Sequence, residues 1–266
     1  MKQLKHIFST VKASSPVLYK IVWIHFIMAV GCVIGLLVDE CNLMGINVWI
    51  KPLKFCVSGG IYILTVGFLI TLYPYAKRKK NIINNLTSWT LLPETLIIVA
   101  QGARGVPSHY NETSLLDGIL FATMGILISV NVLIMVVFII DTARLKLKVP
   151  RPIQWAILLG WMVVLFGSWI GGQMINQMAH NVGVADGGAG LPLVNWSTIA
   201  GDLRIAHFFG LHGIQIIPLF ALGLYHKWKS PLKQLSFVVI VFGLLYTGWI
   251  GYTFLQAKQG IPLLNI

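Results

Sequence analysis

The sequence has few charged residues. Asp, Glu, Lys and Arg make up 11% of its 266 residues, against about a quarter in an ordinary soluble domain. Because 56% of the residues are hydrophobic, a soluble fold is excluded. Acidic residues are scarcest, since eight Asp and Glu face twenty Lys and Arg and give a formal net charge of +12. This excess does not indicate nucleic-acid binding, because the basic residues lie at the ends of long apolar runs, where membrane topology explains them.

Cysteine is also rare, and familiar motifs are absent from the sequence. Cys32, Cys41 and Cys56 show no metal-binding spacing and argue against a disulfide framework. The sequence has no internal repeat, no low-complexity tract and no Gly-rich phosphate motif. The length suits one bundle of about seven helices of about 20 residues each. We therefore expect a single transmembrane domain over residues 1–266.

Seven apolar segments are long enough to cross a bilayer, and they predict an all-α integral membrane protein with a seven-helix bundle. The third segment is the shortest and carries Glu94. The predicted spans are Val17–Val38, Trp49–Leu72, Trp89–Ala103, Leu115–Ile140, Ile153–Ile175, Ile205–Tyr225 and Leu235–Leu255.

The basic residues alternate from side to side along these spans. With seven crossings and the amino terminus inside, fifteen of the twenty lie on the inner side. The positive-inside rule therefore predicts a cytoplasmic amino terminus and an outer carboxyl terminus. This orientation is opposite to that of seven-helix receptors and microbial rhodopsins. The charge bias and the lack of a recognisable transit peptide favour a plasma membrane, and specifically a bacterial inner membrane.

Polar side chains recur on one face of several predicted spans. A single such face is explained by a hydrogen-bonded helix contact, and we interpret His25 in this way. Ionisable side chains at membrane depth, however, need partners or water. The faces are formed by Lys51, Lys54, Ser58, Tyr62 and Thr65 in the second span, by Glu94, Gln101 and Arg104 in the third, by Gln173, Asn176, Gln177 and His180 in the fifth, and by Arg204, His207 and Gln215 in the sixth, with His212 at its edge. Most of them lie in the outer half, which predicts one polar pocket that opens outward and reaches Glu94.

Two outer segments are dense in hydrogen-bonding side chains. Residues 101–111 place Arg104, His109 and Asn111 in a turn shaped by Gly and Pro, and residues 180–212 form a long connection before and into the sixth span. Long loops in compact proteins are commonly functional or disordered. Because Asp202 is suited to cap the sixth helix, we expect the second segment to be ordered and to cover the pocket. Glycine pairs within spans, Gly59–Gly60 and Gly171–Gly172, are interpreted as packing points.

Four outer histidines suggest a metal or haem, since neutral imidazole binds iron, copper and zinc. His207 and His212 are five residues apart, whereas two ligands of one metal on a regular helix prefer a spacing of four. The leading hypothesis is therefore a membrane-embedded oxidoreductase, or another enzyme, with haem b or a transition metal held by His207 or His212 together with His109 or His180. In this scheme Arg104 and Arg204 neutralise propionates or an anionic substrate, Glu94 handles protons, and Glu94, Arg104 and His109 are the candidate catalytic residues.

The same pocket allows a function without a cofactor. Lysine and arginine favour carboxylates and phosphates, so the alternative is a transporter or sensor of a small anionic or zwitterionic ligand, or of a lipid-soluble one. A transporter fits less well, since no repeat is visible. The candidate ligand-binding residues are Lys51, Lys54, Gln101, Asn111, Gln173, Gln177, Asp202, Arg204 and Gln215.

Two further functions stay open. A zinc-dependent lipid hydrolase would need three protein ligands and an open water position, and an assembly subunit would use its polar faces to bind partner helices. The expected partners are the lipid bilayer and a second copy of the chain in a homo-oligomer, with no nucleic acid.

Overall fold

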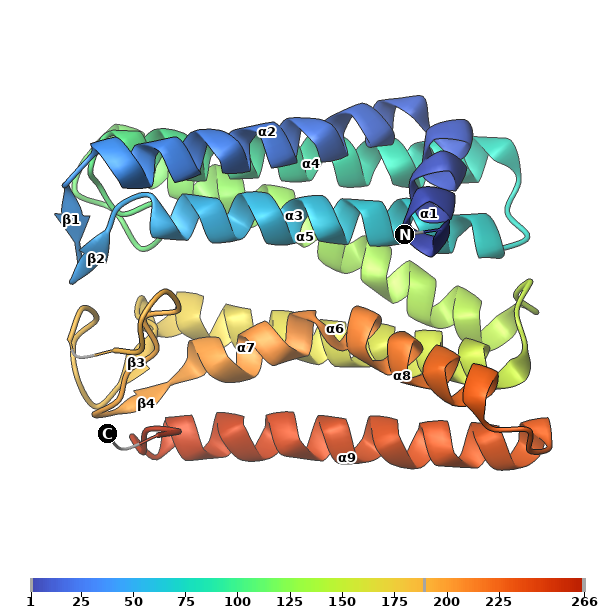
Figure 1. Cartoon of the computed structure of the whole chain (residues 1–266). Helices are drawn as coiled ribbons and strands as arrows, with labels where there is room; N and C mark the ends of the chain where they lie inside the picture. Colours follow the sequence, from blue (N-terminus) through green and yellow to red (C-terminus); the bar gives the residue numbers. More distant parts are fainter. Residues whose placement is uncertain (1, 189, 265–266) are drawn as a thin grey trace. The chain divides into compact units, whose positions relative to one another are not determined.

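The computed structural model describes residues 2–188 and 190–264, and most of them are helical (Figure 1). The chain divides into two compact units, unit 1 (Met1–Ile134) and unit 2 (Met135–Ile266). Helix α5 (Leu115–Arg144) contributes its residues up to Ile134 to unit 1 and the rest to unit 2. The prediction of an all-α architecture of the multi-pass membrane type is confirmed.

Unit 1 begins with two helices that a single residue, Ser15, separates. They are α1 (Lys2–Ser14) and α2 (Pro16–Val38), and α1 lies across the start of α2 in Figure 1. The Ser15 side chain accepts a hydrogen bond from the Leu18 N–H, and a proline at the first helical position favours a helix start there. Val11 of α1 is fully buried and packs with Leu18 against Gly67. The sequence interpretation missed α1, because it used the lysines of this segment only as a topology signal.

The rest of unit 1 is a hairpin and two further helices beside α2. The hairpin consists of β1 (Asn42–Leu43) and antiparallel β2 (Ile46–Asn47), and the helices are α3 (Ile50–Leu69), extended by the 3-10 turn η1 (Ile70–Leu72), and α4 (Lys77–Ala103). Figure 1 shows α2, α3 and α4 running side by side.

The three helices meet at a buried histidine. His25 of α2 has its Nδ1 2.9 Å from the Ile21 carbonyl oxygen and its Nε2 3.2 Å from the Thr95 hydroxyl of α4. A Cβ atom on Gly59 of α3 would lie 3.1 Å from the His25 ring, and one on Gly60 would meet Phe26 at 3.0 Å. His25 is therefore a hydrogen-bonded helix contact, and Gly59 and Gly60 are packing points, as predicted.

Unit 2 contains four further helices and a short ribbon. They are α6 (Arg151–Gln177), β3 (Asn181–Val182), β4 (Gly201–Asp202), α7 (Leu203–Leu211), α8 (Gly213–Lys227) and α9 (Leu232–Lys258). The ribbon is antiparallel and pairs Asn181 with Asp202 and Val182 with Gly201. Its second strand lies directly on α9, since a Cβ atom on Gly201 would come within 1.9 Å of the Ala257 carbonyl oxygen. Glycines also bring α6 and α7 together, because a Cβ on Gly210 would lie 2.6 Å from the Gly167 Cα atom.

The predicted sixth span is not one regular helix. A bend of 50° at His212 separates α7 from α8. Glycines flank this point, and Pro218 has no N–H to donate to the carbonyl one turn earlier, so the sequence disfavours an unbroken helix. Arg204 and His207 therefore lie on α7 and Gln215 on α8, and the single face predicted for them is wrong.

The predicted face on the fifth span is also wrong at its end. α6 stops at Gln177, and Met178 has a left-handed backbone with φ 51°. His180 consequently lies in the loop after the helix and not on the same helical face as Gln173 and Gln177.

In the part of the chain that the structure describes, five helices are long and apolar enough to cross a membrane. They are α2, α3 with η1, α5, α6 and α9, and the bent pair α7 and α8 makes a sixth if it forms one span. The predicted third span lies within α4, which has 27 residues but begins with Lys77, Arg78, Lys79 and Lys80 and carries Glu94. With these polar residues, α4 is not among the helices that are apolar enough to cross a membrane. The count of seven spans and the orientation of the termini therefore stay predictions.

We expect Gly167→Val to destabilise unit 2, because the Cβ atom that the valine adds would lie 2.7 Å from the Gly210 carbonyl carbon. Overpacking of this kind costs about 1–3 kcal/mol. The thermal unfolding midpoint of the detergent-purified protein should fall. Gly172→Ala on the same helix is the control, since a Cβ there has no atom within 4 Å. A midpoint unchanged by Gly167→Val would show that α6 and α7 are not in close contact at this position.

Candidate functional site

The predicted site residues divide between the two units. Unit 1 holds Lys51, Lys54, Glu94, Gln101, Arg104, His109 and Asn111, and unit 2 holds Gln173, Gln177, His180, Asp202, Arg204, His207, His212 and Gln215. Within each unit, contacts between neighbouring helices bring several of them together.

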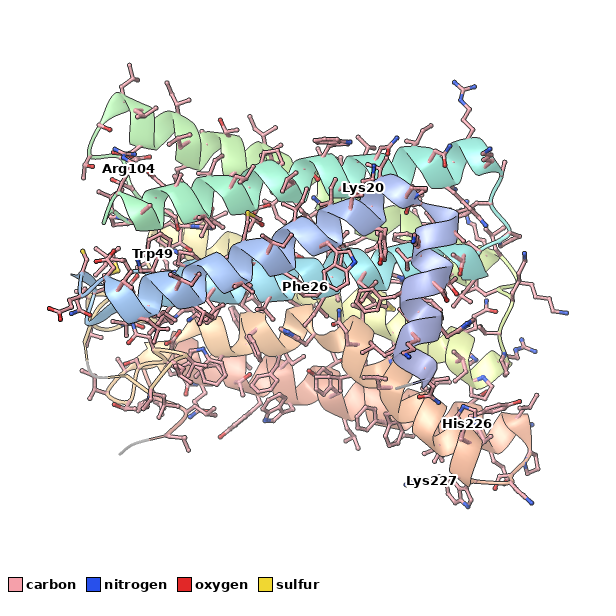
Figure 2. The ribbon with its side chains drawn as sticks, turned by 45° about the horizontal axis from the view of Figure 1, so that its top comes forward. Lys20, Phe26, Trp49, Arg104, His226 and Lys227 are labelled. Atoms are coloured by element: carbon pink, nitrogen blue, oxygen red, sulfur yellow. The ribbon has the colours of Figure 1, made fainter. Side chains whose placement is uncertain are left out.

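In unit 1, most of the predicted residues gather where α4 ends and α3 begins. A Cβ atom on Gly102 would lie 2.7 Å from Pro52, and the Phe55 and His109 rings are 5.7 Å apart. Lys51 and Lys54 lie in the first two turns of α3, on either side of Pro52. Figure 2 shows Arg104 and Trp49 at this end of the unit and Lys20 away from it. The start of α3 and the end of α4, which carry these residues, therefore lie side by side in unit 1.

Arg104 at this end has an acidic partner. Its Nη1 donates to Asp117 Oδ1 at 2.7 Å, and Gln101 Nε2 donates to the same oxygen at 2.8 Å. The Ser114 hydroxyl donates to the other Asp117 oxygen at 2.6 Å. Asp117 is only 3% exposed, so its charge is compensated almost entirely by these side chains. The arginine that we predicted as a clamp for an external anion already holds an internal one.

His109 and Asn111 shape the loop between α4 and α5. The His109 Nδ1 lies 3.0 Å from the Ser108 hydroxyl, and its ring packs against Phe55 and Phe121. Buried Asn111 donates to the Pro107 carbonyl and accepts from the N–H and hydroxyl of Thr113. Asn111 therefore holds the turn, and the His109 ring packs between α3 and α5.

Glu94 lies near the middle of α4, away from this end. It is 7% exposed, and its Oε2 has no hydrogen-bond partner among residues 2–188 and 190–264. The next residue, Thr95, contacts His25. A buried carboxyl oxygen without a partner is expensive, and such groups commonly mark functional positions in membrane proteins.

In unit 2, the loop between α6 and α7 is held by Asp186. Its carboxylate accepts hydrogen bonds from the backbone N–H groups of His180 and Asn181 and lies 2.5 Å from the His180 Nδ1. Burial raises the pKa of Asp186, but the hydrogen bonds that its carboxylate accepts from His180 and Asn181 outweigh this effect, so that the pKa is about 2. These hydrogen bonds tie the start of the loop to Asp186.

Asp202 organises the start of α7. Its buried carboxylate, 1% exposed, accepts from the backbone N–H groups of Ser197 and Arg204 and from the Arg204 guanidinium. The predicted helix cap is confirmed. Arg204 also donates to the Asn195 carbonyl, so this arginine, like Arg104, is held inside its own unit.

The remaining two histidines lie on α7 and at the bend that follows it. The Nδ1 of His207 is 2.8 Å from the Gly167 carbonyl oxygen, and the Nδ1 of His212 is 2.7 Å from the Phe208 carbonyl oxygen. Gly171 gives His207 its room, since a Cβ there would lie 2.8 Å from the ring. Each of these two imidazoles therefore has a backbone carbonyl at its Nδ1 atom, as His180 has the Asp186 carboxylate.

The three glutamines of unit 2 have different surroundings. Gln177 donates to the Ala179 and Asn181 carbonyls and accepts from the Lys258 ammonium at 3.4 Å. It stabilises the start of the loop. Gln173 is half-buried on α6, one turn before Gln177, and Gln215 lies in the first turn of α8, past the bend.

The sequence interpretation missed the acceptors that hold the predicted residues. Asp117 was read as part of an apolar span, although its spacing of three from Ser114 is typical of a helix start. Asp186 was noted only as part of the loop. The Gly167 carbonyl that holds His207 gives no signal in the sequence, because any residue supplies a carbonyl.

Comparisons with protein-family models, curated proteins and solved structures find no match to this chain. Within residues 2–188 and 190–264, no group of three or more His, Cys, Asp or Glu side chains is arranged to hold a metal ion. The function therefore has to be inferred from the two sites themselves.

We expect Asp186→Asn to loosen the loop between α6 and α7. The folded pKa of about 2 is below the usual value of about 3.9, so the carboxylate stabilises the loop fully above about pH 4, and the stabilisation is lost as the pH falls towards 2. At pH 7 a protease should cut this loop severalfold faster in the variant. In the wild type, pepsin cleavage should accelerate between pH 4 and 2.

Glu40→Gln, which changes an exposed acidic residue of unit 1, is the control for this experiment. Equal cleavage of Asp186→Asn and wild type at pH 7 would contradict the proposed role of Asp186.

Proposed function

We propose that the protein is a membrane-embedded oxidoreductase that holds a haem, or a single transition metal ion, through histidines of unit 2. The supporting observation is that the Nδ1 atom of each of His180, His207 and His212 lies next to an oxygen acceptor of unit 2. A haem bound there would supply one-electron chemistry.

The acceptors favour this proposal because of what they do to an imidazole. A histidine that donates its Nδ1 proton to a carbonyl or carboxylate has the lone pair on Nε2, the atom that binds a metal. The Asp186 carboxylate acts in this way on His180, and the carbonyls of Gly167 and Phe208 act on His207 and His212. Histidines that bind metals in proteins almost always have such a partner.

The surroundings of these histidines suit a flat apolar cofactor. The Phe208 ring lies 4.2 Å from the His212 ring and also contacts Trp196 of the loop, and Phe209 contacts Trp249 of α9. On α6, Gly172 has open space beside it. A haem needs only one or two histidines, so the lack of a cluster of three ligands among the described residues weighs against zinc hydrolysis more than against haem.

The alternative of an anion carrier or sensor is less well supported. Arg104 and Arg204 each hold a buried carboxylate of their own unit. An external carboxylate or phosphate would have to compete with these pairs, and breaking a buried pair is costly.

We further propose the finer topology that the sequence predicts. In this proposal α4 is the third of seven spans, and the amino terminus lies in the cytoplasm of a bacterium. Glu94 then handles protons in the bilayer, and Arg104 and His109 lie at the outer end of unit 1 as further candidates for catalysis.

We expect protein purified in mild detergent to show a Soret band that shifts on reduction by dithionite, with stoichiometric iron in the same sample. His207→Ala should lose the bound cofactor, and Asp186→Asn should weaken its binding about tenfold, as a change of the histidine's hydrogen-bond partner typically does. His207→Gly with added imidazole should regain the band if the ring is a ligand.

His226→Ala is the matched control, because this histidine is exposed in the last turn of α8. A folded sample without absorbance or metal, from cells supplied with haem precursors and iron, would overturn the proposal. The anion carrier or sensor would then be tested by uptake of a labelled anion into proteoliposomes, with Arg104→Ala as the variant.

A further inference from the structure

Five polar side chains of unit 1 are buried without a hydrogen-bond partner for at least one atom in the described part of the chain. They are Asn84, Thr87, Ser88 and Glu94 of α4 and Asn131 of α5. Each is less than 10% exposed. On an α-helix the four α4 residues share one face, since their spacings of three, four, seven and ten are those of neighbouring turns.

The face continues onto α5 through one hydrogen bond. The Asn131 amide donates to the Thr90 hydroxyl at 2.7 Å and leaves its own Oδ1 without a partner. Along the axis of α4, Thr90 lies about 4.5 Å beyond Thr87 and Glu94 about 6 Å beyond Thr90, because a helix rises about 1.5 Å per residue. One water molecule bridges gaps of this size, and buried waters usually satisfy such polar groups.

Beyond Glu94 the same face is closed. Thr95 is bonded to His25, Ile98 is 1% exposed, and Gln101 is bonded to Asp117. The partnerless atoms on α4 therefore lie at Glu94 and on the side of the basic run Lys77–Lys80. Pro93, the residue before Glu94, has no N–H and so cannot donate to the Trp89 carbonyl, which leaves that oxygen able to accept a hydrogen bond.

We propose that this face of α4 is a one-sided proton path that leads from the basic end of unit 1 to Glu94. Water carries a proton along Asn84, Thr87 and the Thr90–Asn131 pair to the Glu94 carboxylate, which becomes a carboxylic acid. The proton leaves by the same route, and only O–H bonds form and break. The path rests on residues other than the histidines of unit 2, so it can be right or wrong independently of the haem.

Few other ionisable groups lie at the level of Glu94. The contact between Thr95 and His25 puts His25 of α2 there, and the contact between Gly59 and Thr95 puts Cys56 and Tyr62 of α3 within one turn. The facing part of α5, between Gly125 and Asn131, has no ionisable side chain. Glu94 is therefore the acid to which a proton on this path would bind.

Infrared spectroscopy of the protein in lipid tests this path directly. The carboxylic acid band that is missing in Glu94→Gln belongs to Glu94. We expect this band to appear within the accessible pH range and to shift within seconds of transfer to D₂O. Asn84→Leu combined with Thr87→Val should keep the band and slow its shift at least tenfold. Glu112→Gln, at an exposed position in the α4–α5 loop, should change neither.

A band that exchanges only over hours, or a shift unchanged by the double variant, would overturn the proposal, as would the absence of the band at every pH. Should the double variant fail to fold, Ser88→Cys in a chain without the three native cysteines gives a second measurement. Silver ions should modify this thiol rapidly, whereas a cysteine at fully buried Ile63 should be protected. Equal protection of both thiols would contradict a hydrated path.

Discussion

Buried carboxylates determine how both units are built at the ends that carry the predicted site. Asp117 in unit 1 and Asp202 in unit 2 are almost completely buried, and each is surrounded by an arginine and by donors from a helix start. Removing the arginine from either pair would leave the carboxylate with less compensation of its charge and would destabilise that end of the unit. The loops between α4 and α5 and between α6 and α7 can therefore adopt few other conformations while these carboxylates stay buried.

The same constraint separates structural polar residues from those available for chemistry. Arg104, Arg204 and Asn111 use their donors on partners in their own unit. The imidazoles of His180, His207 and His212 use their Nδ1 atoms in this way. Glu94 has a carboxyl oxygen without a partner among the described residues. The proposed chemistry therefore rests on the three histidines and on Glu94, and not on the arginines.

Much of the fold could be predicted from the sequence, because apolar runs and charge bias report directly on burial in lipid. The Asp202 cap was also predictable, since local spacing determines it. The bend at His212 was predictable only in part, because Gly210, Gly213 and Pro218 disfavour an unbroken helix but hydropathy does not report where a helix bends. The pairing of Arg104 with Asp117 was missed for a similar reason, since it joins residues thirteen apart across a turn. Hydropathy also understates α4, whose buried face is polar.

The contact between β4 and α9 restricts which residue can stand at position 201. A side chain of any size at Gly201 would occupy the position of the Ala257 carbonyl oxygen, so only glycine allows the two segments to touch. Gly167 and Gly210 impose the same requirement between α6 and α7. Gly167, Gly201 and Gly210 thus form a sequence pattern that these close contacts require, whatever the rest of the sequence is. Distant relatives that share unit 2 can be sought by this pattern where whole-chain comparison finds none.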